Sequence, residues 1–153
     1  MPLLAPDVGE VAIIDYALST TTPEAQTLKL YTNNYDAVEG STASNFTEAS
    51  GSGYAAISLV RATWNAASTS GGTTTKTYPQ QTFTYTGAIT IVGYFIVGAT
   101  SGTLLWAERL YAGAGQAFAN NDTLKVTVTS GGSMSGKCPW ERNILVRLSE
   151  PTG

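Results

Sequence analysis

Two neighbouring charged residues, Glu108 and Arg109, are the best-placed candidates for chemistry in this chain. They follow the apolar residues 104–107, and a carboxylate shielded from water there could serve as one of the two acids of a glycosidase. Consecutive side chains of a strand point to opposite faces, however, so the two need not act together. We therefore expect each to find its own partner at a sheet edge or at a contact with another subunit. We expect the protein not to be an enzyme.

Other catalytic and metal-binding systems lack their residues. The chain contains no histidine, which excludes Ser-His-Asp and Cys-His nucleophiles and most zinc and iron sites. The glycine-rich residues 51–53 and 113–115 are too short for a phosphate-binding or dinucleotide-binding loop. The single cysteine, Cys138, cannot form a disulfide within the chain and is expected to remain a free thiol. We therefore expect no cofactor and no metal ion.

A calcium site is one alternative. Asp36, Glu39 and Glu48 fall in and just after the polar stretch that follows the first expected strand, and they could share an ion with main-chain carbonyls. Their spacing is not that of a regular calcium-binding loop, so the sequence does not predict the site.

Aromatic residues offer a second alternative, a platform that stacks against sugar rings. The chain has three tryptophans and eight tyrosines. Trp64 and Trp106 lie within expected strands, so we assign both to the core. Trp140 follows residues 130–139, a flexible loop rich in Gly, Ser and Met, and it is the aromatic side chain that we expect at a partner contact.

Composition limits the classes of partner. Charged residues make up 12% of the 153 residues, about half the usual share, and the net charge of −3 comes without any basic run. Nucleic acid is therefore not an expected partner. The N-terminal residues lack the charged and apolar regions of a secretory signal, and no run is long enough to cross a membrane. We expect a protein that is made in a cytoplasm and does not bind a membrane.

The elements that position these residues are mainly strands. Residues 89–97 and 104–110 form the most apolar part of the chain, and their Ile, Val, Tyr and Phe side chains suit a strand that is covered on both faces. Small residues join the two runs, and Gly98 and Gly102 can supply the positive φ that a tight turn needs. We therefore predict a hairpin at the centre of the fold.

Further strands are expected in the stretches 26–32, 54–60, 62–67, 79–86, 124–128 and 143–149, most of which alternate apolar and polar residues. The polar residues 68–76 and the Gly/Ala-rich residues 111–119 are expected to be connections. So many strands with closely spaced turns indicate an all-β fold, either an antiparallel β-sandwich or a jelly roll.

One short helix is predicted near the N-terminus. Asp7 and Glu10 have the spacing of a capping box, and an apolar stripe follows at Val11, Ile14 and Leu18. Such a stripe is the pattern of a helix with a single buried face. A strand in the same place is the alternative, because Val, Ile and Tyr favour strands.

Residues 1–6 precede the helix as an extended apolar arm, separate from a single β-sandwich domain over residues 7–153. An arm of this kind cannot pack on itself, so it either lies along its own domain or reaches a neighbouring molecule. Leu3 and Leu4 would each contribute about 1.5–3 kcal/mol if they were fully buried against a partner.

Several phrases of the sequence resemble small structural proteins of tailed bacteriophages. They are LKLYTNN at residues 28–34, FTEA at 46–49, GYAA at 53–56, GYFIV at 93–97, LLWAER at 104–109 and NNDTL at 120–124. The resemblance implies a virion component made in the bacterial cytoplasm, and within this group a capsid decoration (cement) protein that binds the major capsid protein and bridges neighbouring capsomers. It also implies a homo-oligomer, with a trimer favoured at a three-fold position of the capsid. It supplies no catalytic residues.

The candidate partner contacts are therefore Leu3, Leu4, Glu108, Arg109 and Trp140. The alternative function is a tail-tip, tail-fibre or carbohydrate-binding β-sandwich module that recognises a host glycan. A hydrolase of the glycosidase type is the third hypothesis.

Overall fold

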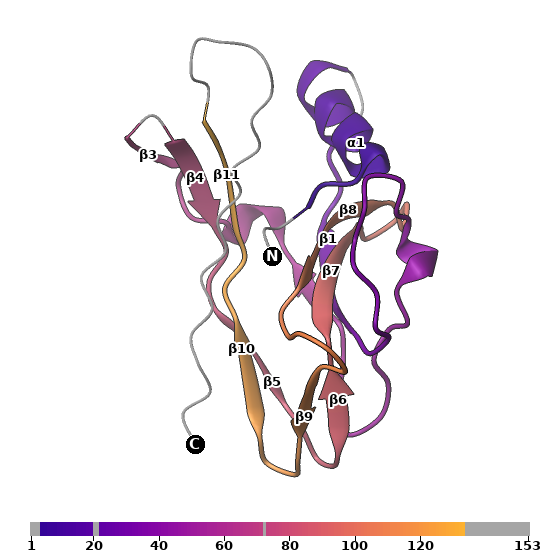
Figure 1. Cartoon of the computed structure of the whole chain (residues 1–153). Coiled ribbons are helices and arrows are strands. Elements are labelled where there is room, and N and C mark those ends of the chain that lie inside the picture. The colour runs from indigo at the N-terminus through magenta and orange to yellow at the C-terminus, as the bar shows by residue number, and fades with distance from the viewer. Residues whose placement is uncertain (1–3, 20–21, 72, 134–153) are drawn as a thin grey trace.

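Antiparallel strands are the main regular structure of the described chain, and one α-helix lies near its N-terminus (Figure 1). The computed structural model describes residues 4–19, 22–71 and 73–133. Within them, the helix α1 covers Asp7–Leu18, and two 3₁₀ turns cover Ala43–Asn45 and Arg61–Thr63. The strands are β1 (Gln26–Tyr31), β2 (Ile57–Leu59), β3 (Ser68–Ser70), β4 (Thr73–Thr77), β5 (Gln81–Thr84), β6 (Ile89–Ile91), β7 (Gly93–Gly98), β8 (Leu104–Arg109), β9 (Gln116–Phe118), β10 (Thr123–Val126) and β11 (Thr129–Ser133). The predicted all-β class with one short N-terminal helix is therefore confirmed.

A four-stranded sheet in the order β2-β1-β7-β8 forms one layer. β1 pairs with β7 along its whole length, from Gln26 opposite Gly98 to Tyr31 opposite Gly93. β7 and β8 form the predicted hairpin, and Gly102 in its turn has a φ of 69°, which a residue without a Cβ adopts readily. β6, which the sequence predicts as part of the same apolar strand, pairs instead with β9.

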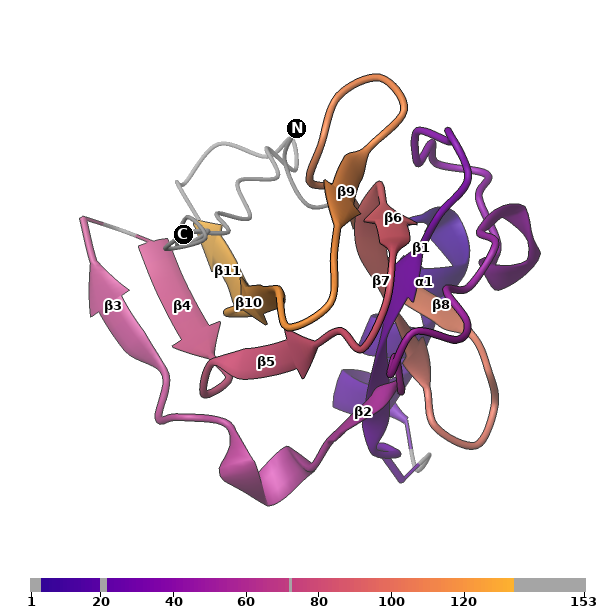
Figure 2. The ribbon, with the colours of Figure 1, turned by 90° about the horizontal axis from the view of Figure 1, so that it is seen from below.

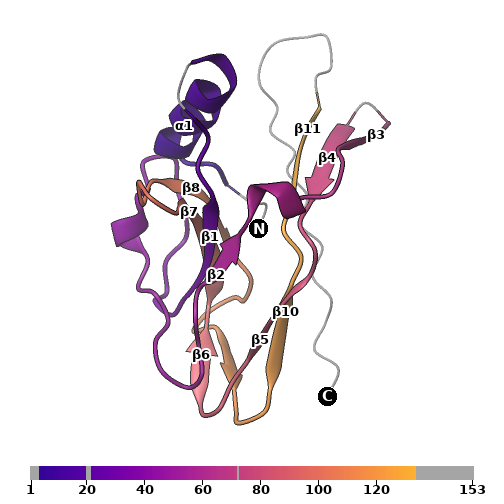
Figure 3. The ribbon, with the colours of Figure 1, turned by 180° about the vertical axis from the view of Figure 1, so that it is seen from behind.

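A long ribbon forms the second layer. β4 and β5 follow each other along one side of it, and β11 and β10 run antiparallel to them on the other side. β3 adds a third strand beside β4. Seen from below, the ribbon lies to one side of the central sheet, with β5 leading toward the sheet and β3 and β4 farthest from it (Figure 2). The view from behind shows β5 and β10 side by side, at the end of the molecule that also holds β6 (Figure 3).

The main hydrophobic core lies between the two layers. It includes Leu28, Leu30, Ile96 and Trp106 from the central sheet, and Phe83, Tyr85, Leu124, Val126 and Val128 from the ribbon and its connections. Leu124, Val126 and Val128 are at most 4% exposed. The alternation predicted for residues 124–128 is therefore confirmed.

The opposite face of the central sheet is covered as well. Tyr31, Phe95 and Leu104 are at most 3% exposed. The chain after β1 brings Phe46 over them, and the ring centroids of Phe46 and Phe95 are 5.1 Å apart. Every residue of β7 is buried, which confirms burial on both faces for residues 93–97 of the predicted run, whereas Thr90 in β6 is exposed.

Three stretches that the sequence predicts as connections contain strands. Residues 68–70 form β3, residues 73–76 belong to β4, residues 116–118 form β9, and residues 130–133 belong to β11. The β3 side chains are all exposed Ser and Thr, so hydrophobic periodicity gives no signal there, although Thr itself suits a strand. Conversely, the strand predicted at residues 62–67 is wrong, because the end of a 3₁₀ turn and irregular backbone occupy all of it. The strand predicted at residues 54–60 is shortened to β2.

The described part of the N-terminal arm lies along its own sheet. The N–H of Leu4 donates to the carbonyl of Ala107 at 3.0 Å, and the N–H of Ala107 donates back to Leu4 at 2.9 Å. Ala5 is 6% exposed. Leu4 therefore forms an isolated β-bridge to β8 at the edge of the sheet.

The predicted capping box is wrong. Pro6 is the N-cap residue of α1, and no side chain caps the helix there. Asp7 is already the first helical residue. The N–H groups of Gly9 and Glu10 donate to the Pro6 carbonyl at 2.8 and 3.0 Å. Leu3, Cys138, Trp140 and the strand predicted at residues 143–149 lie outside the described residues.

Candidate functional site

Glu108 is enclosed in the main sheet and is held by a tyrosine. It lies opposite Tyr94 in the pairing of β7 with β8, is 7% exposed, and accepts a hydrogen bond from the Tyr94 hydroxyl at 2.7 Å. Burial raises the pKa of the Glu108 carboxyl, although the hydrogen bond from Tyr94 acts in the opposite direction. Burial likewise raises the pKa of Tyr94, and the negative carboxylate beside it adds to that effect. The hydrogen-bonding partner of this carboxylate is thus a phenol rather than the second acid of a glycosidase.

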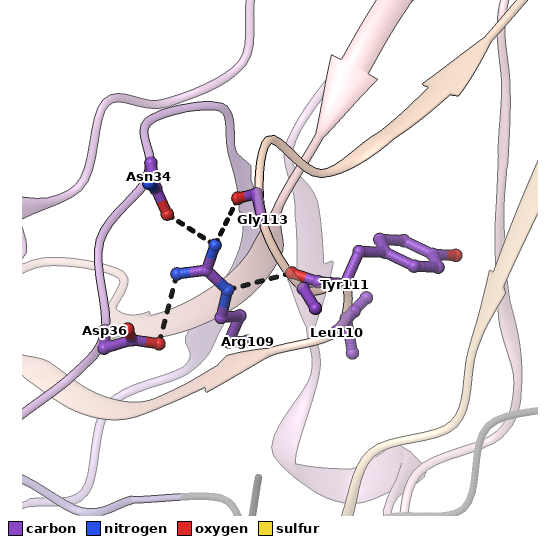
Figure 4. Close-up of a pocket in the computed structure, with 7 residues that line it drawn as sticks. Asn34, Asp36, Arg109, Leu110, Tyr111 and Gly113 are labelled. Atoms are coloured by element: carbon purple, nitrogen blue, oxygen red, sulfur yellow. Dashed lines mark hydrogen bonds and ion pairs between the residues drawn. The ribbon is translucent and has the colours of Figure 1, made fainter.

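Arg109 follows Glu108 in β8, so strand alternation directs it to the opposite face, as expected. Its side chain holds two loops against the strand (Figure 4). Its Nε donates to the carbonyl of Tyr111 at 2.9 Å, and one terminal nitrogen donates to Asp36 Oδ1 at 3.1 Å. The other terminal nitrogen donates to the Asn34 side chain and to the carbonyl of Gly113. The side chain is only 9% exposed, so this guanidinium is a buried, almost fully engaged donor.

A shallow pocket of about 520 Å³ lies over this arginine. Its lining comprises Asn34, Asp36, Arg109, Leu110, Tyr111, Ala112 and Gly113. Its charged and amide groups already hydrogen-bond one another, and the ring of Tyr111 is directed away from the guanidinium (Figure 4). This arrangement stabilises the loops and offers a ligand few unengaged polar groups.

The structure does not gather the three acids of the calcium alternative. Asp36 pairs with Arg109, whereas Glu48 pairs with Lys29 at 2.8 Å and accepts a hydrogen bond from Tyr54 at 3.1 Å. Among the described residues, no cluster of three or more acids, cysteines or histidines could hold a metal ion.

The two tryptophans assigned to the core are packed there. Trp106 is 8% exposed. Trp64 is partly buried against the core, with its ring centroid 5.3 Å from that of Tyr78 in an edge-to-face contact. Neither presents an open aromatic face of the kind that stacks on a sugar ring.

Helix α1 is held against the sheet by its smallest residues. Gly9 is buried, and a Cβ placed on it would collide with the carbonyl oxygens of Leu104 and Leu105. Ala12 packs against the main core. Because these side chains are so small, the helix backbone approaches the start of β8 closely.

Near the C-terminal end of α1, Glu24 links the helix to the turn between β7 and β8, and this link is called the tether below. The Tyr16 hydroxyl donates to Glu24 Oε1 at 3.0 Å. The other carboxylate oxygen of Glu24 accepts from the N–H groups of Thr100 and, at 3.0 Å, Ser101, in the turn between β7 and β8. Burial alone would raise the pKa of Glu24, but the hydrogen bonds from Ser101, Thr100 and Tyr16 outweigh it and hold the pKa at about 2.

The apolar stripe of α1 faces outward. Val11, Ile14 and Leu18, called the outer stripe below, are 61%, 50% and 83% exposed. The sequence therefore locates the stripe correctly, but the expectation that it is the buried face is wrong. Gly9, Ala12 and Tyr16 occupy the packed side instead. Val8 and Ile13 are also exposed, by 39% and 37%.

The sequence analysis did not identify the residues that orient α1 and engage Arg109. Gly9 carries a usable signal, because a glycine inside a helix costs stability and indicates close packing. Glu24 and Asn34 carry none, because each acts on a turn or strand more than 70 residues away in the chain.

Comparisons with protein-family models, curated proteins and solved structures found no match to this chain. Among the described residues, no helix has the length and apolar character needed to span a membrane.

Proposed function

We propose that this chain is a virion structural protein, and more specifically a capsid decoration protein that binds the major capsid protein and bridges neighbouring capsomers. The observation that carries the proposal is the outer stripe of α1. A helix that exposes several large apolar side chains while its small residues face the core is built to be covered by another molecule. The two layers are taken to be a β-sandwich that presents this helix.

The charged residues in the core support a structural role. Glu108 hydrogen-bonds to Tyr94, and Arg109 is engaged by Asp36, Asn34 and two main-chain carbonyls. Both were candidate partner contacts, and both already have partners within the chain. Leu3, Leu4 and Trp140 remain proposed contacts, with the main chain of Leu4 forming an isolated β-bridge to β8.

The size of the outer stripe favours weak contacts repeated many times. Burying one such side chain completely contributes about 1.5–3 kcal/mol, and association itself costs several kcal/mol. One copy would therefore bind weakly. A capsid presents many equivalent sites, and a proposed trimer at a three-fold position would engage several of them together.

Purified protein and empty heads of the phage that encodes it provide the test. We expect the protein to co-sediment with expanded empty heads and to raise their melting temperature, and cryo-electron microscopy of the parent particle should show it on the capsid surface. Binding to host cell-surface glycans without any affinity for heads would contradict the proposal in favour of a recognition module.

A further inference from the structure

We propose that α1 docks as a helix into an apolar groove that is rimmed by lysine or arginine side chains on another protein. This inference rests on the proposed function, in which the capsid protein supplies the groove, and it names the docking element and the chemistry of the partner. The helix-in-groove mode buries one apolar stripe and leaves flanking charges to meet the rim.

The two sides of α1 have different roles: one carries the outer stripe, and the other packs against the sheet. Successive residues of a helix are about 100° apart, so Val11, Ile14 and Leu18 fall within one narrow sector. Gly9 and Tyr16 fall on the opposite side, where they contact the sheet and its turn. The outer stripe therefore points directly away from its own core, which is the orientation that a docking helix requires.

Charge on the helix selects the partner. Glu10 and Asp15 flank the outer stripe, Asp7 lies in the same sector at the first residue of the helix, and residues 7–18 contain no lysine or arginine. A groove with a basic rim complements this pattern, and an anionic lipid surface does not.

A second copy of the same helix fits less well. If Val11 and Ile14 take the a and d positions of a parallel pair, Glu10 of one copy lies at the position that faces Asp15 of the other. Like charges at such positions oppose pairing.

The helix is ready to bind without rearrangement. The Asp7 N–H donates to the Glu39 carbonyl at 2.9 Å, and the Tyr16 hydroxyl is fixed by Glu24 at 3.0 Å. Since both ends are held in the free protein, docking avoids the entropy cost of ordering a loose segment.

The test uses the full chain, with purified empty heads of the encoding phage as the probe. The double substitution Val11→Ser and Leu18→Ser should weaken binding at least about tenfold, because it removes two contacts of the outer stripe. Asp15→Lys should weaken binding several-fold at low salt and reduce its dependence on salt. The matched control is Val60→Ser, which replaces an apolar side chain that is 51% exposed outside α1. It should bind like the wild type.

Each other outcome overturns the inference in a distinct way. Equal binding by the wild type and the double variant would show that α1 is not the docking element, while the proposed function would stand. No binding by the wild type would overturn the proposed function and this partner with it. Dimers or trimers of the free chain that the double variant abolishes in sedimentation would identify a second copy as the occupant. Binding to phosphatidylglycerol vesicles that the double variant abolishes would identify a membrane.

Discussion

Glu108 is a carboxylate whose environment favours its protonated form. Burial raises the pKa of its carboxyl above the ordinary value of 4.5, despite the hydrogen bond from Tyr94. An acid with a raised folded pKa contributes stability below its unfolded pKa and loses that contribution as the pH rises through the folded pKa. The ionised carboxylate therefore costs stability at neutral pH.

Replacing Glu108 with Gln should raise the melting temperature at pH 7 and change it little at pH 4. The amide oxygen can still accept the hydrogen bond from Tyr94, and the buried charge is gone. Thermal unfolding at both pH values measures the effect, and binding to heads should be unchanged. Tyr94→Phe is the comparison, because it removes the donor and should cost about 1–3 kcal/mol. A melting temperature that E108Q lowers equally at both pH values would contradict the account.

At the scale of elements, Glu24 joins the end of α1 to the turn between β7 and β8. Hydrogen bonds from Ser101, Thr100 and Tyr16 outweigh the effect of burial and hold its pKa at about 2, below the ordinary 4.5. An acid with a lowered folded pKa contributes stability above its unfolded pKa and loses it as the pH falls through the folded pKa. The tether is therefore complete above about pH 4.5 and weakens as the pH approaches 2.

Glu24→Gln should lower the melting temperature at pH 7 and have progressively less effect as the pH falls from 4.5 toward 2. The reason is that the charge-assisted hydrogen bonds are lost in the variant at every pH and in the wild type only in acid. Unfolding curves across that range provide the measurement. A difference between the two proteins that stays constant down to pH 2 would show that the charge of Glu24 is not what stabilises the turn.

Gly9→Ala should destabilise the protein even though alanine favours helices. The added Cβ would meet the carbonyl oxygens of Leu104 and Leu105, and overpacking of this kind costs about 1–3 kcal/mol. The melting temperature should fall by about 2–10 °C. Gly40→Ala is the matched control, because a Cβ there meets nothing within 4 Å. A stabilised Gly9→Ala variant would mean that α1 does not pack closely on β8.

Strands could be predicted from the sequence where their apolar side chains are buried in the core. The alternation of Leu124, Val126 and Val128 and the apolar run of β7 are read directly from the sequence, because each pattern reflects burial. The hairpin of β3 and β4 was missed because the side chains of β3 are exposed and polar. Main-chain pairing and a hydrogen bond between the Thr69 and Thr74 hydroxyls join β3 to β4, and neither leaves a trace in hydropathy.

At the scale of the whole molecule, the candidate site was half predictable. The stripe of α1 is visible in the spacing of Val11, Ile14 and Leu18, but the direction it faces depends on what Gly9 and Tyr16 contact elsewhere in the chain. Likewise, the sequence separates Glu108 from Arg109 by strand geometry but gives no sign of Tyr94 or Asn34 as their partners. Pairing between distant segments determines both outcomes.

The pairing of Leu4 with Ala107 and of β1 with β7 also sets the order in which the protein can fold. β1 pairs with β2 on one side, but its pairing with β7 and the close contact of α1 with β8 both need residues 93–109. Such distant pairings are slow to form, and during synthesis they cannot begin until those residues have left the ribosome. The outer stripe of α1 therefore takes its final orientation only after roughly two-thirds of the chain has been made. Before that point, nascent chains cannot associate through a helix that is packed on its own sheet.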